Sequence, residues 1–298
     1  DQRLSRGLGD VYKRQWSYSM ELDPGATQVS GDTDTEGSQS AQNDDTKLTL
    51  TTPYGTVGMF ISEGGLDVED AASQSVYARP TDMGGSDGTV DNFTIDAYNN
   101  LQYHTPADLI PFGGSFKIAY APDLDTYGSG NNSGVTATEG KSDYVGRSAT
   151  EMQVSFDAIP FAEGLKIGAS YFEFDKQGAA RKDQEAESGA YYATYSIGNV
   201  SLGYSQAYKA LLVATAANTG VEYYDQVNQS ISYAINDDLS VSYESEKSEA
   251  NYVLDSTAAV EQKSTGIQIA YNLGGMTLAL ARNSHDNPSY STSNADLD

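Results

Sequence analysis

Carboxylates are the side chains of this sequence best able to do chemistry, and they gather in one segment, residues 62–98. The segment holds eight Asp and Glu residues against a single basic residue, Arg79. Four of the acids lie close together near its start: Glu63, Asp67, Glu69 and Asp70. Asp67 is a favourable helix N-cap and acids suit a first helical turn, so we expect a short helix here. Such a cluster attracts cations, whereas the plainer interpretation is a solvated loop with unremarkable acidity.

The residue types of common catalytic and metal sites are scarce. His104 and His285 are the only histidines, they lie far apart in the sequence, and there is no cysteine. A Ser-His-Asp site requires a fixed geometry that scattered serines do not indicate, and without thiols there is no disulfide or Cys-based metal site. We therefore expect no catalytic residue, no metal site and no cofactor. The net charge of −25 argues against nucleic acid as a partner, because few basic groups are available to neutralise phosphates.

Residues 1–15 differ from the rest of the chain. Ser5–Gln15, SRGLGDVYKRQ, resembles one reading frame of a transposon-end adaptor used in preparing DNA sequencing libraries, and residues 10–15 match its conserved end. Four of the seventeen Lys and Arg residues of the chain also fall in this stretch. We interpret residues 1–15 as a non-native, adaptor-derived tail and exclude it from fold reasoning. The alternative is a genuine basic N-terminal tail.

From Trp16 onward the dominant period of the sequence is two residues. For example, Val200, Leu202 and Tyr204 alternate with small or polar residues. Strict alternation predicts strands with one apolar and one polar face, so the fold class is all-β. We expect thirteen strands, near 16–22, 46–52, 55–62, 99–105, 115–121, 149–157, 164–174, 188–197, 200–208, 223–235, 239–247, 264–271 and 276–282. Several are shorter than a tilted membrane strand requires, and we expect polar residues to extend them into the loops.

The connections between these strands alternate between long and short through six cycles. Segments 62–98 and 122–149 are long, for example, whereas the turns at Gly198-Asn199 and 236–238 are minimal. Outer-membrane β-barrels place short turns at one end and long loops at the other, whereas a soluble β-sandwich has no reason to do so. The polar faces carry small or hydrophilic residues, as a water-filled interior requires. The pattern favours a transmembrane antiparallel β-barrel in which the apolar faces meet lipid.

Short motifs give the chain a resemblance to the general bacterial porins, and more closely to the porins of marine alphaproteobacteria. The residues that carry it are 54–60 (YGTVGMF), 101–106 (LQYHTP), 113–122 (GGSFKIAYAP), 233–236 (YAIN) and 270–274 (AYNLG). The resemblance covers residues 16–298 and implies a barrel of sixteen strands, three barrels in a trimer, and an inward-folding loop after strand five. Residues 62–98 are then the candidate constriction loop.

On this alignment the chain is truncated at both ends. Trp16–Leu22 becomes strand three and Met276–Arg282 becomes strand fifteen, so about thirteen strands are present and strands one, two and sixteen are absent. The family ends on an aromatic residue, whereas this chain ends on Asp298. Tyr290–Leu297 is interpreted as the stump of strand sixteen. We expect an incomplete barrel, in which strands three and fifteen pair in parallel, or leave a gap, or are separated by that stump.

The resemblance also implies roles for charged residues. The acids Glu63, Asp67, Glu69 and Asp70 are expected at the constriction, where carboxylates favour cations; the alternative is an external solvated loop. Basic wall residues oppose the constriction loop in the family, and here Lys47, Lys117 and Lys166 fall on polar strand faces and are expected to point into the lumen. The alternative is that these three lysines are ordinary polar residues of the barrel wall with no role in selectivity. Outward tyrosines are expected to form girdles at the membrane interfaces.

The sequence therefore predicts a passive diffusion channel in the outer membrane of a Gram-negative bacterium. Its expected partners are small hydrophilic solutes and ions, outer-membrane lipid and, when intact, two further copies in a homotrimer, with a preference for cations and no enzymatic activity. One alternative is a soluble, secreted, acidic β-sandwich or adhesin-like binding module. A barrel with an enzymatic rim is a third, and it requires a histidine that converges with an acid and a serine.

Overall fold

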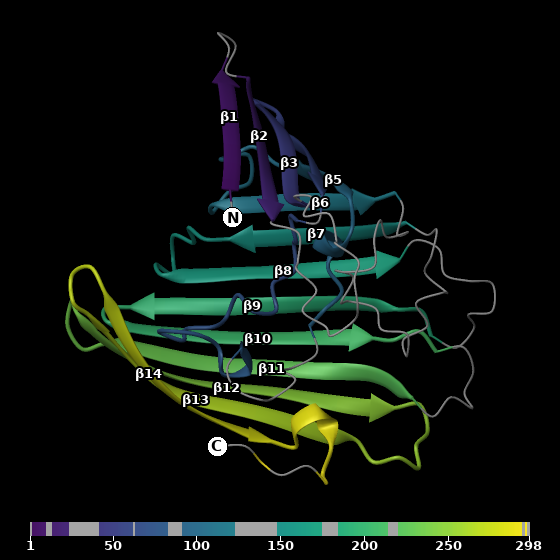
Figure 1. Cartoon of the computed structure of the whole chain (residues 1–298), viewed down its shortest axis with the longest axis vertical. Coiled ribbons are helices and arrows are strands. Elements are labelled where there is room, and N and C mark those ends of the chain that lie inside the picture. The colour runs from purple at the N-terminus through teal and green to yellow at the C-terminus, as the bar shows by residue number, and fades with distance from the viewer. Residues whose placement is uncertain are drawn as a thin grey trace, which may run out of the picture.

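The structure, a computed structural model, describes residues 2–9, 14–23, 42–61, 63–82, 91–122, 148–174, 184–213, 220–293 and 296. Within these residues, fourteen strands form one antiparallel sheet in which each strand pairs with the next along the chain (Figure 1). They are β1 (Gln2–Gly9), β2 (Gln15–Asp23), β3 (Gln42–Thr52), β4 (Gly55–Ile61), β5 (Asn100–His104), β6 (Gly114–Ala121), β7 (Ala149–Phe156), β8 (Leu165–Phe174), β9 (Glu187–Ile197), β10 (Val200–Ala210), β11 (Val221–Ala234), β12 (Leu239–Tyr252), β13 (Val260–Asn272) and β14 (Thr277–Asp286).

The thirteen strands predicted from the two-residue period correspond to β2–β14, so the all-β prediction is confirmed. The strands near the C-terminus are longer than the apolar pattern alone indicated. β12 continues to Tyr252 and β13 begins at Val260, because polar residues continue the hydrogen-bonded ladder between them as far as the pair Ala250–Val260. Polar residues therefore extend these strands toward the long connections, as expected.

β1 lies within the stretch interpreted as an adaptor-derived tail. It pairs antiparallel with β2 from Gln2–Leu22 to Gly9–Gln15. The adaptor origin of residues 1–15 stays a prediction, because backbone pairing carries no information on where a sequence comes from. With β1 in place, β1 and β14 are the two edges of the sheet, and no ladder joins them within the described residues.

The C-terminal residues do not form the predicted strand stump where they are described. Pro288–Tyr290 forms a 3-10 turn, and the Tyr290 hydroxyl donates a hydrogen bond to Ser248 Oγ at 2.7 Å. The Tyr290 ring also lies 5.2 Å from the ring of Tyr224. The segment after β14 therefore folds back against β11 and β12, which satisfies the tyrosine hydroxyl without a sheet partner.

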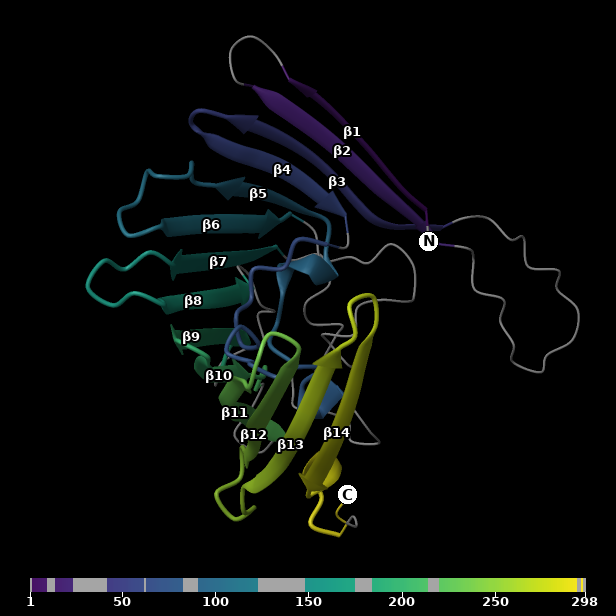
Figure 2. The same ribbon diagram turned by 90° about the vertical axis from the view of Figure 1, so that its left-hand side faces the viewer.

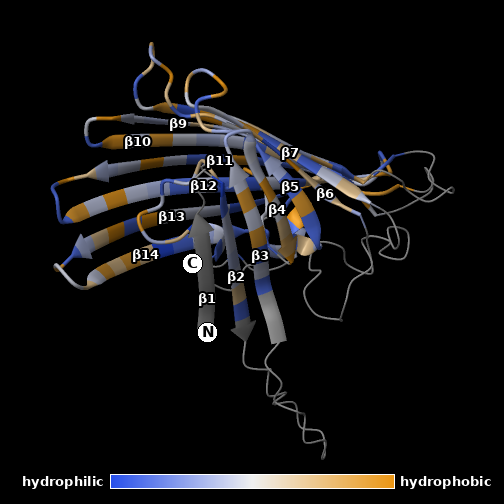
Figure 3. Ribbon diagram, turned by 90° about the horizontal axis from the view of Figure 1, so that it is seen from above, coloured by the Kyte–Doolittle hydropathy of each residue, from blue (hydrophilic) through white to orange (hydrophobic). Residues whose placement is uncertain are grey.

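The sheet curls into an arc with β1–β4 at one end and β12–β14 at the other (Figure 2). Side chains alternate between its two faces: on β11, Ile231 and Tyr233 are 42% and 45% exposed on the convex face, whereas Asn228 and Ser230 are buried on the concave face. Figure 3 shows the same alternation of hydrophobic and hydrophilic residues along the strands. The tyrosines expected in girdles include Tyr204, Tyr243 and Tyr271, which lie exposed among these apolar side chains.

Within the described residues, no helix has the length and apolar character needed to span a membrane.

Candidate functional site

The segment between β4 and β5 lies inside the arc of the sheet rather than outside it (Figure 2). We call residues 63–98 the inner loop; it is described over 63–82 and 91–98. The predicted helix at Asp67 is wrong. Two successive turns replace it, with Ala71 N–H donating to Val68 O at 3.1 Å and Ser73 N–H donating to Asp70 O at 3.0 Å. 3-10 helices occur instead at Pro80–Asp82 and Ile95–Ala97.

Small residues on the concave face give the inner loop room to lie against the sheet. A Cβ on Gly203 of β10 would collide with the carbonyl oxygen of Ala72, so no larger residue fits beneath the loop there. The same carbonyl accepts a hydrogen bond from Ser230 Oγ at 2.6 Å, and Ser205 Oγ donates to Glu69 O at 2.7 Å. These small polar residues, which the sequence suggested line a water-filled interior, contact backbone instead of water at these positions.

One wall carboxylate holds both arms of the inner loop. Glu151 of β7 is buried, and its Oε2 accepts the backbone N–H of Leu66 at 3.3 Å and that of Ile95 at 2.9 Å. Next to it, Gln153 Nε2 donates to Leu66 O at 2.9 Å. Leu66 lies on the arm that leaves β4 and Ile95 on the arm that returns to β5, so Glu151 fixes the separation between the two arms.

Two further carboxylates, on β12, hold the middle of the inner loop. Glu244 Oε2 accepts the hydroxyls of Ser73 at 2.7 Å and Ser75 at 2.5 Å. Glu246 Oε2 accepts the Thr81 backbone N–H at 3.1 Å and its hydroxyl at 2.8 Å. The sequence placed both glutamates on a polar strand face, but their partners lie about 165–171 residues away in the chain. Sequence reasoning missed these contacts, and alternation within β12 was the only signal for them.

Hydrogen bonds between β13 and the loop backbone continue the attachment. Gln268 Oε1 accepts the N–H of Tyr77 at 3.0 Å, and its Nε2 donates to Ala78 O. At the base of the loop, Asn100 Nδ2 donates to Tyr98 O at 3.0 Å and to Glu63 O at 3.1 Å. Side chains of β5, β7 and β10–β13 thus satisfy the backbone of a loop that has little regular structure, which removes most of the cost of burying it.

Apolar contacts anchor the loop at β6–β8 and at residues next to the ends of β9 and β10. The buried cluster comprises Leu66, Phe93, Ile95 and Tyr98 from the loop with Ala119, Ala121, Ala149, Phe172, Phe174, Ala186 and Leu211 from the wall side. The ring centroids of Phe93 and Phe174 lie 5.1 Å apart in an edge-to-face arrangement. Lys209 Nζ lies 4.4 Å from the centroid of the Phe93 ring, a favourable cation–π geometry. The space inside the arc is therefore partly filled by a small core.

The predicted acids at the start of the inner loop occupy different environments. Glu63 Oε2 pairs with Lys47 Nζ at 3.0 Å, and Asp70, 49% exposed, pairs with Arg79. Glu69 is only 7% exposed, and burial together with the charge of Asp67 raises its pKa to about 8. Asp67 is half-buried. Of the four acids, only Asp67 and Glu69 are close enough to influence each other, whereas Glu63 and Asp70 pair with different basic residues.

Asp67 also belongs to a close group at Gly65. Asp67 Oδ1, Asp96 Oδ2 and Thr94 Oγ1 each lie 2.9 Å from the point where a Cβ on Gly65 would sit. Any side chain at position 65 would displace these oxygens. Burial and the nearby Asp67 raise the pKa of Asp96. The sequence gave no signal for Asp96 as a member of the acidic group, since it lies 29 residues after Asp67.

The predicted basic residues are spread along the wall. Lys47 contacts the loop through Glu63. Lys117 shares a face of β6 with the buried Ala119, and it is the register partner of His104 on β5. Lys166 shares a face of β8 with Ser170 and lies exposed near the turn that precedes β8. The structure therefore brings only Lys47 into contact with the predicted acids, and the role of the three lysines in a transverse field stays a prediction.

The chain matches the family model described as Gram-negative porin over residues 4–287. It belongs to the Gram-negative porins. No curated protein sequence matches the chain. Among solved structures it is similar to OmpT of Vibrio cholerae (12% identity, TM-score 0.58, 95% of this chain and 77% of that chain) and to the outer-membrane channel DcaP of Acinetobacter baumannii (11%, 0.58, 99% and 80%). Salmonella typhi OmpF is similar as well (14%, 0.55, 95% and 86%).

Membership of the family decides between the functions that the sequence left open. The porin is an outer-membrane diffusion channel of a Gram-negative bacterium and not an enzyme. The soluble β-sandwich is wrong, since the sheet is the wall of a porin β-barrel, and the enzymatic rim is wrong as well. The His285 ring Nδ1 lies 2.9 Å from Ser264 Oγ, but this contact is a buried hydrogen bond between paired residues of the neighbouring strands β13 and β14. Among the described residues no group of three or more His, Cys, Asp or Glu is arranged to hold a metal ion.

Proposed function

We propose that this porin passes small hydrophilic solutes and inorganic ions with a preference for cations, and that the inner loop is its constriction. The observation that carries the proposal is the charge of the loop inside the arc: over its described residues, 63–82 and 91–98, it has seven carboxylates against the single Arg79. Carboxylates lining a narrow passage lower the barrier for cations and raise it for anions. Glu63, Asp67, Glu69 and Asp70 are the proposed constriction residues.

The structure supports unequal contributions from these acids. Asp70 and Glu63 each pair with one basic residue, Arg79 and Lys47, but the Asp70 side chain is 49% exposed and that of Glu63 only 16%. The raised pKa of Glu69 keeps that side chain largely protonated near neutral pH. Asp67 and Asp70 therefore carry most of the proposed preference, and Lys47, Lys117 and Lys166 are the proposed basic groups on the opposite wall.

The reversal potential across planar bilayers in a KCl gradient tests the proposal. We expect a potential of the sign that cation preference produces, and a smaller one for the double variant Asp67→Asn, Asp70→Asn. The matched control is Glu261→Gln, because Glu261 pairs with Lys247 on the outer face of the sheet. An anion-preferring pore, or an unchanged potential in the double variant, contradicts the proposal.

The homotrimer and the marine alphaproteobacterial type are proposals that rest on the resemblance of the sequence motifs. Exposed apolar side chains on the convex face, such as Leu278 and Leu280, suit contact with lipid or with another copy. Native mass spectrometry from detergent micelles tests the trimer, and a mass of one chain only contradicts it.

The adaptor origin of residues 1–15 is tested by sequencing the genomic locus, where an in-frame coding stretch identical to these residues contradicts it.

A further inference from the structure

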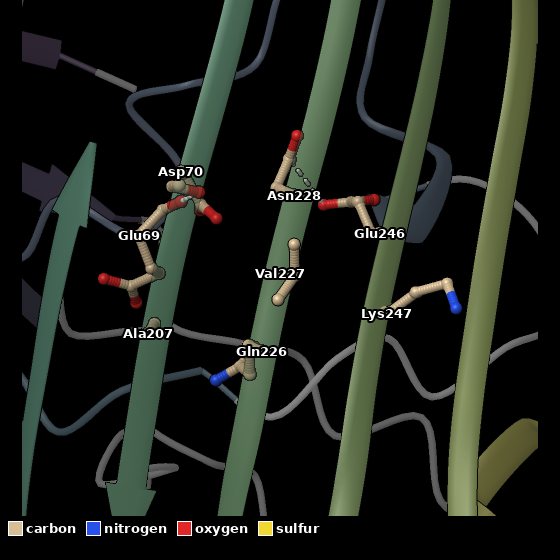
Figure 4. Close-up of a pocket in the computed structure, with 9 residues that line it drawn as sticks. Glu69, Asp70, Ala207, Gln226, Val227, Asn228, Glu246 and Lys247 are labelled. Carbon is tan, nitrogen blue, oxygen red and sulfur yellow. Dashed lines mark hydrogen bonds between the residues drawn. The ribbon is translucent and has the colours of Figure 1, made fainter. Parts of the chain in front are cut away.

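The inner loop does not fill the space against the wall strands β11 and β12. A hollow of about 270 Å³, including its open side, is lined by Glu69 and Asp70 of the loop and by Asn228 and Glu246 of the wall (Figure 4). In this view the side chains of Glu69 and Asn228 point apart rather than toward each other. The placement of the loop therefore depends on contacts beyond this hollow, among them those at its base.

Three polar side chains form a row at that base, on the concave face of β5. Asn100, Gln102 and His104 occupy alternate positions of the strand, so they share one face of the sheet. Asn100 and Gln102 are each only 3% exposed, whereas His104 is half-buried. The row leads from the far end of β5 to its first residue, next to the point where the inner loop joins the strand.

Asn100, the first member of the row, bonds to both arms of the inner loop. Its Nδ2 donates to Glu63 O at 3.1 Å on the outgoing arm. The same amide donates to Tyr98 O at 3.0 Å and to Ile95 O at 3.3 Å on the returning arm. Because the amide protons face these carbonyls, Asn100 Oδ1 points the other way, toward Gln102.

Gln102 continues the row in the same direction. Its Nε2 donates to Asn100 Oδ1 at 2.9 Å and to Gly64 O at 2.5 Å. Gly64 has a φ of +90°, and a Cβ there would lie 2.6 Å from this Nε2, so only glycine allows the close approach. Turning the Gln102 amide over would place its Oε1 against two other oxygens. Gln102 Oε1 is therefore directed toward His104.

His104 supplies the proton at the end of the row. Its Nε2 lies 2.7 Å from Gln102 Oε1. An amide oxygen accepts hydrogen bonds and cannot donate them, so the hydrogen-bond pattern requires a proton on Nε2. The neutral Nε2–H tautomer and the imidazolium both carry that proton. The ring of Phe60 stacks on the imidazole, with 6.3 Å between ring centroids and 29° between ring planes, and this contact holds the orientation of the ring.

We propose that His104 is a positioning residue of the constriction: its Nε2–H orients Gln102 and, through Asn100, both arms of the inner loop. The inference rests on the proposed function, because it takes the inner loop as the constriction. Without the imidazole donor, the buried Gln102 Oε1 either stays unpaired or turns and breaks the bonds to Gly64 and Asn100. Either change loosens the arm that carries the Glu63 carboxylate.

Hydrogen exchange of the loop amides, measured by mass spectrometry on the full chain in detergent, tests this role. A glutamine side chain at position 104 can place an N–H where Nε2 lies, whereas an asparagine reaches only as far as Nδ1. We expect His104→Gln to exchange like the unmodified chain. His104→Asn should exchange about fivefold faster over residues 63–67 and 95–98, the factor that corresponds to about 1 kcal/mol for one lost hydrogen bond.

Two outcomes of the exchange experiment overturn the inference. One is equal exchange in His104→Asn and the unmodified chain. The other is equally fast exchange in His104→Gln and His104→Asn, because the packing of the ring and not its N–H would then hold the loop.

NMR spectra of the ¹⁵N-labelled protein locate the proton itself. The chain has two histidines, and the resonances lost in His104→Gln identify this imidazole. We expect its Nε2 to be protonated, and an Nδ1–H tautomer with an unprotonated Nε2 overturns the inference. Faster exchange in His104→Asn with unchanged single-channel conductance and reversal potential contradicts the inner loop as the constriction, and leaves the hold of His104 on the loop standing.

Discussion

Glu151 of β7 accepts the backbone N–H of Ile95 through its Oε2 at 2.9 Å, and the same oxygen accepts Leu66 N–H at 3.3 Å. The two N–H groups belong to opposite arms of the inner loop, and no strand ladder joins those arms over the described residues 63–82 and 91–98. Glu151 thus takes the place of cross-strand hydrogen bonds, together with the bond that Asn92 N–H on the returning arm donates to Glu69 Oε1 on the outgoing arm at 3.2 Å. The position of the inner loop, the proposed constriction, therefore depends on a buried wall residue.

The first prediction follows from this contact. Glu151→Leu should leave two buried N–H groups without an acceptor, at a cost of roughly 1–3 kcal/mol each, and so loosen both arms of the loop. We expect noisier single-channel currents and faster proteolysis within residues 63–98. Glu151→Gln keeps one acceptor oxygen, so we expect its current noise and its rate of proteolysis to lie between those of Glu151→Leu and those of the unmodified chain. Equal noise and equal cleavage in Glu151→Leu and the unmodified chain would show that the apolar cluster alone fixes the loop.

The second prediction concerns the close approach of the loop to β10. Gly203→Val should push the loop away from the wall, because even a Cβ at this position meets the carbonyl oxygen of Ala72. We expect a lower unfolding temperature and a changed conductance. Gly275→Ala is the control, since no atom lies within 4 Å of a Cβ there. If the two variants have the same conductance and stability, the loop does not lie against β10 as described.

The wall strands could be predicted from the sequence because a two-residue period is a local property. Ile231 and Tyr233 reveal their face within a few residues, and the structure keeps them exposed on the convex side. Long and short connections were equally visible, since turn residues are local signals. The assignment of the fold to a membrane barrel followed from combining these two patterns.

The sequence predicted the position of the inner loop in the chain, but not its conformation or its contacts with the wall. Asp67 was expected to start a helix, but the carbonyls of Glu69 and Ala72 accept hydrogen bonds from Ser205 and Ser230 of the wall, and these contacts replace helical ones. Glu244 and Glu246 were visible only as polar positions of a strand. Their function depends on residues about 165–171 positions away, and a single sequence carries no signal for such a pairing.

The third prediction is a pH dependence that arises from Glu69. Its pKa is raised from 4.5 to about 8 by burial first and then by Asp67, so the folded chain binds this proton more tightly than the unfolded chain does. Stability from this group is fully present below pH 4.5 and is lost as pH rises through about 8. Thermal unfolding in detergent at a series of pH values across this window should show that decline.

The Glu69→Gln variant should remove this part of the decline, because glutamine does not titrate. Cation preference of the unmodified pore should also rise as pH passes about 8, where Glu69 ionises, and should not rise in the variant. Asp67 and Asp70 on the loop, Arg79, and Glu246 on β12 are the neighbouring charges, and all are unchanged by the substitution. Identical pH profiles for the two proteins would refute a titrating Glu69.

The fourth prediction separates the stability and the selectivity that one ion pair contributes. Lys47 and Glu63 lie 3.0 Å apart, with the lysine side chain 40% exposed, so the pair is worth at most about 1 kcal/mol. Lys47→Gln should therefore change the unfolding temperature little, while leaving the Glu63 carboxylate uncompensated at the base of the loop. The permeability ratio of K⁺ to Cl⁻, taken from reversal potentials, should rise.

The control is Lys263→Gln, which removes the same charge from β13. Lys263 alternates with the buried Gln262 and Ser264 and so lies on the outer face, and its substitution should leave the permeability ratio unchanged. A rise of equal size in both variants would mean that the effect reflects the net charge of the protein, and not the position of Lys47 beside the path of the ions.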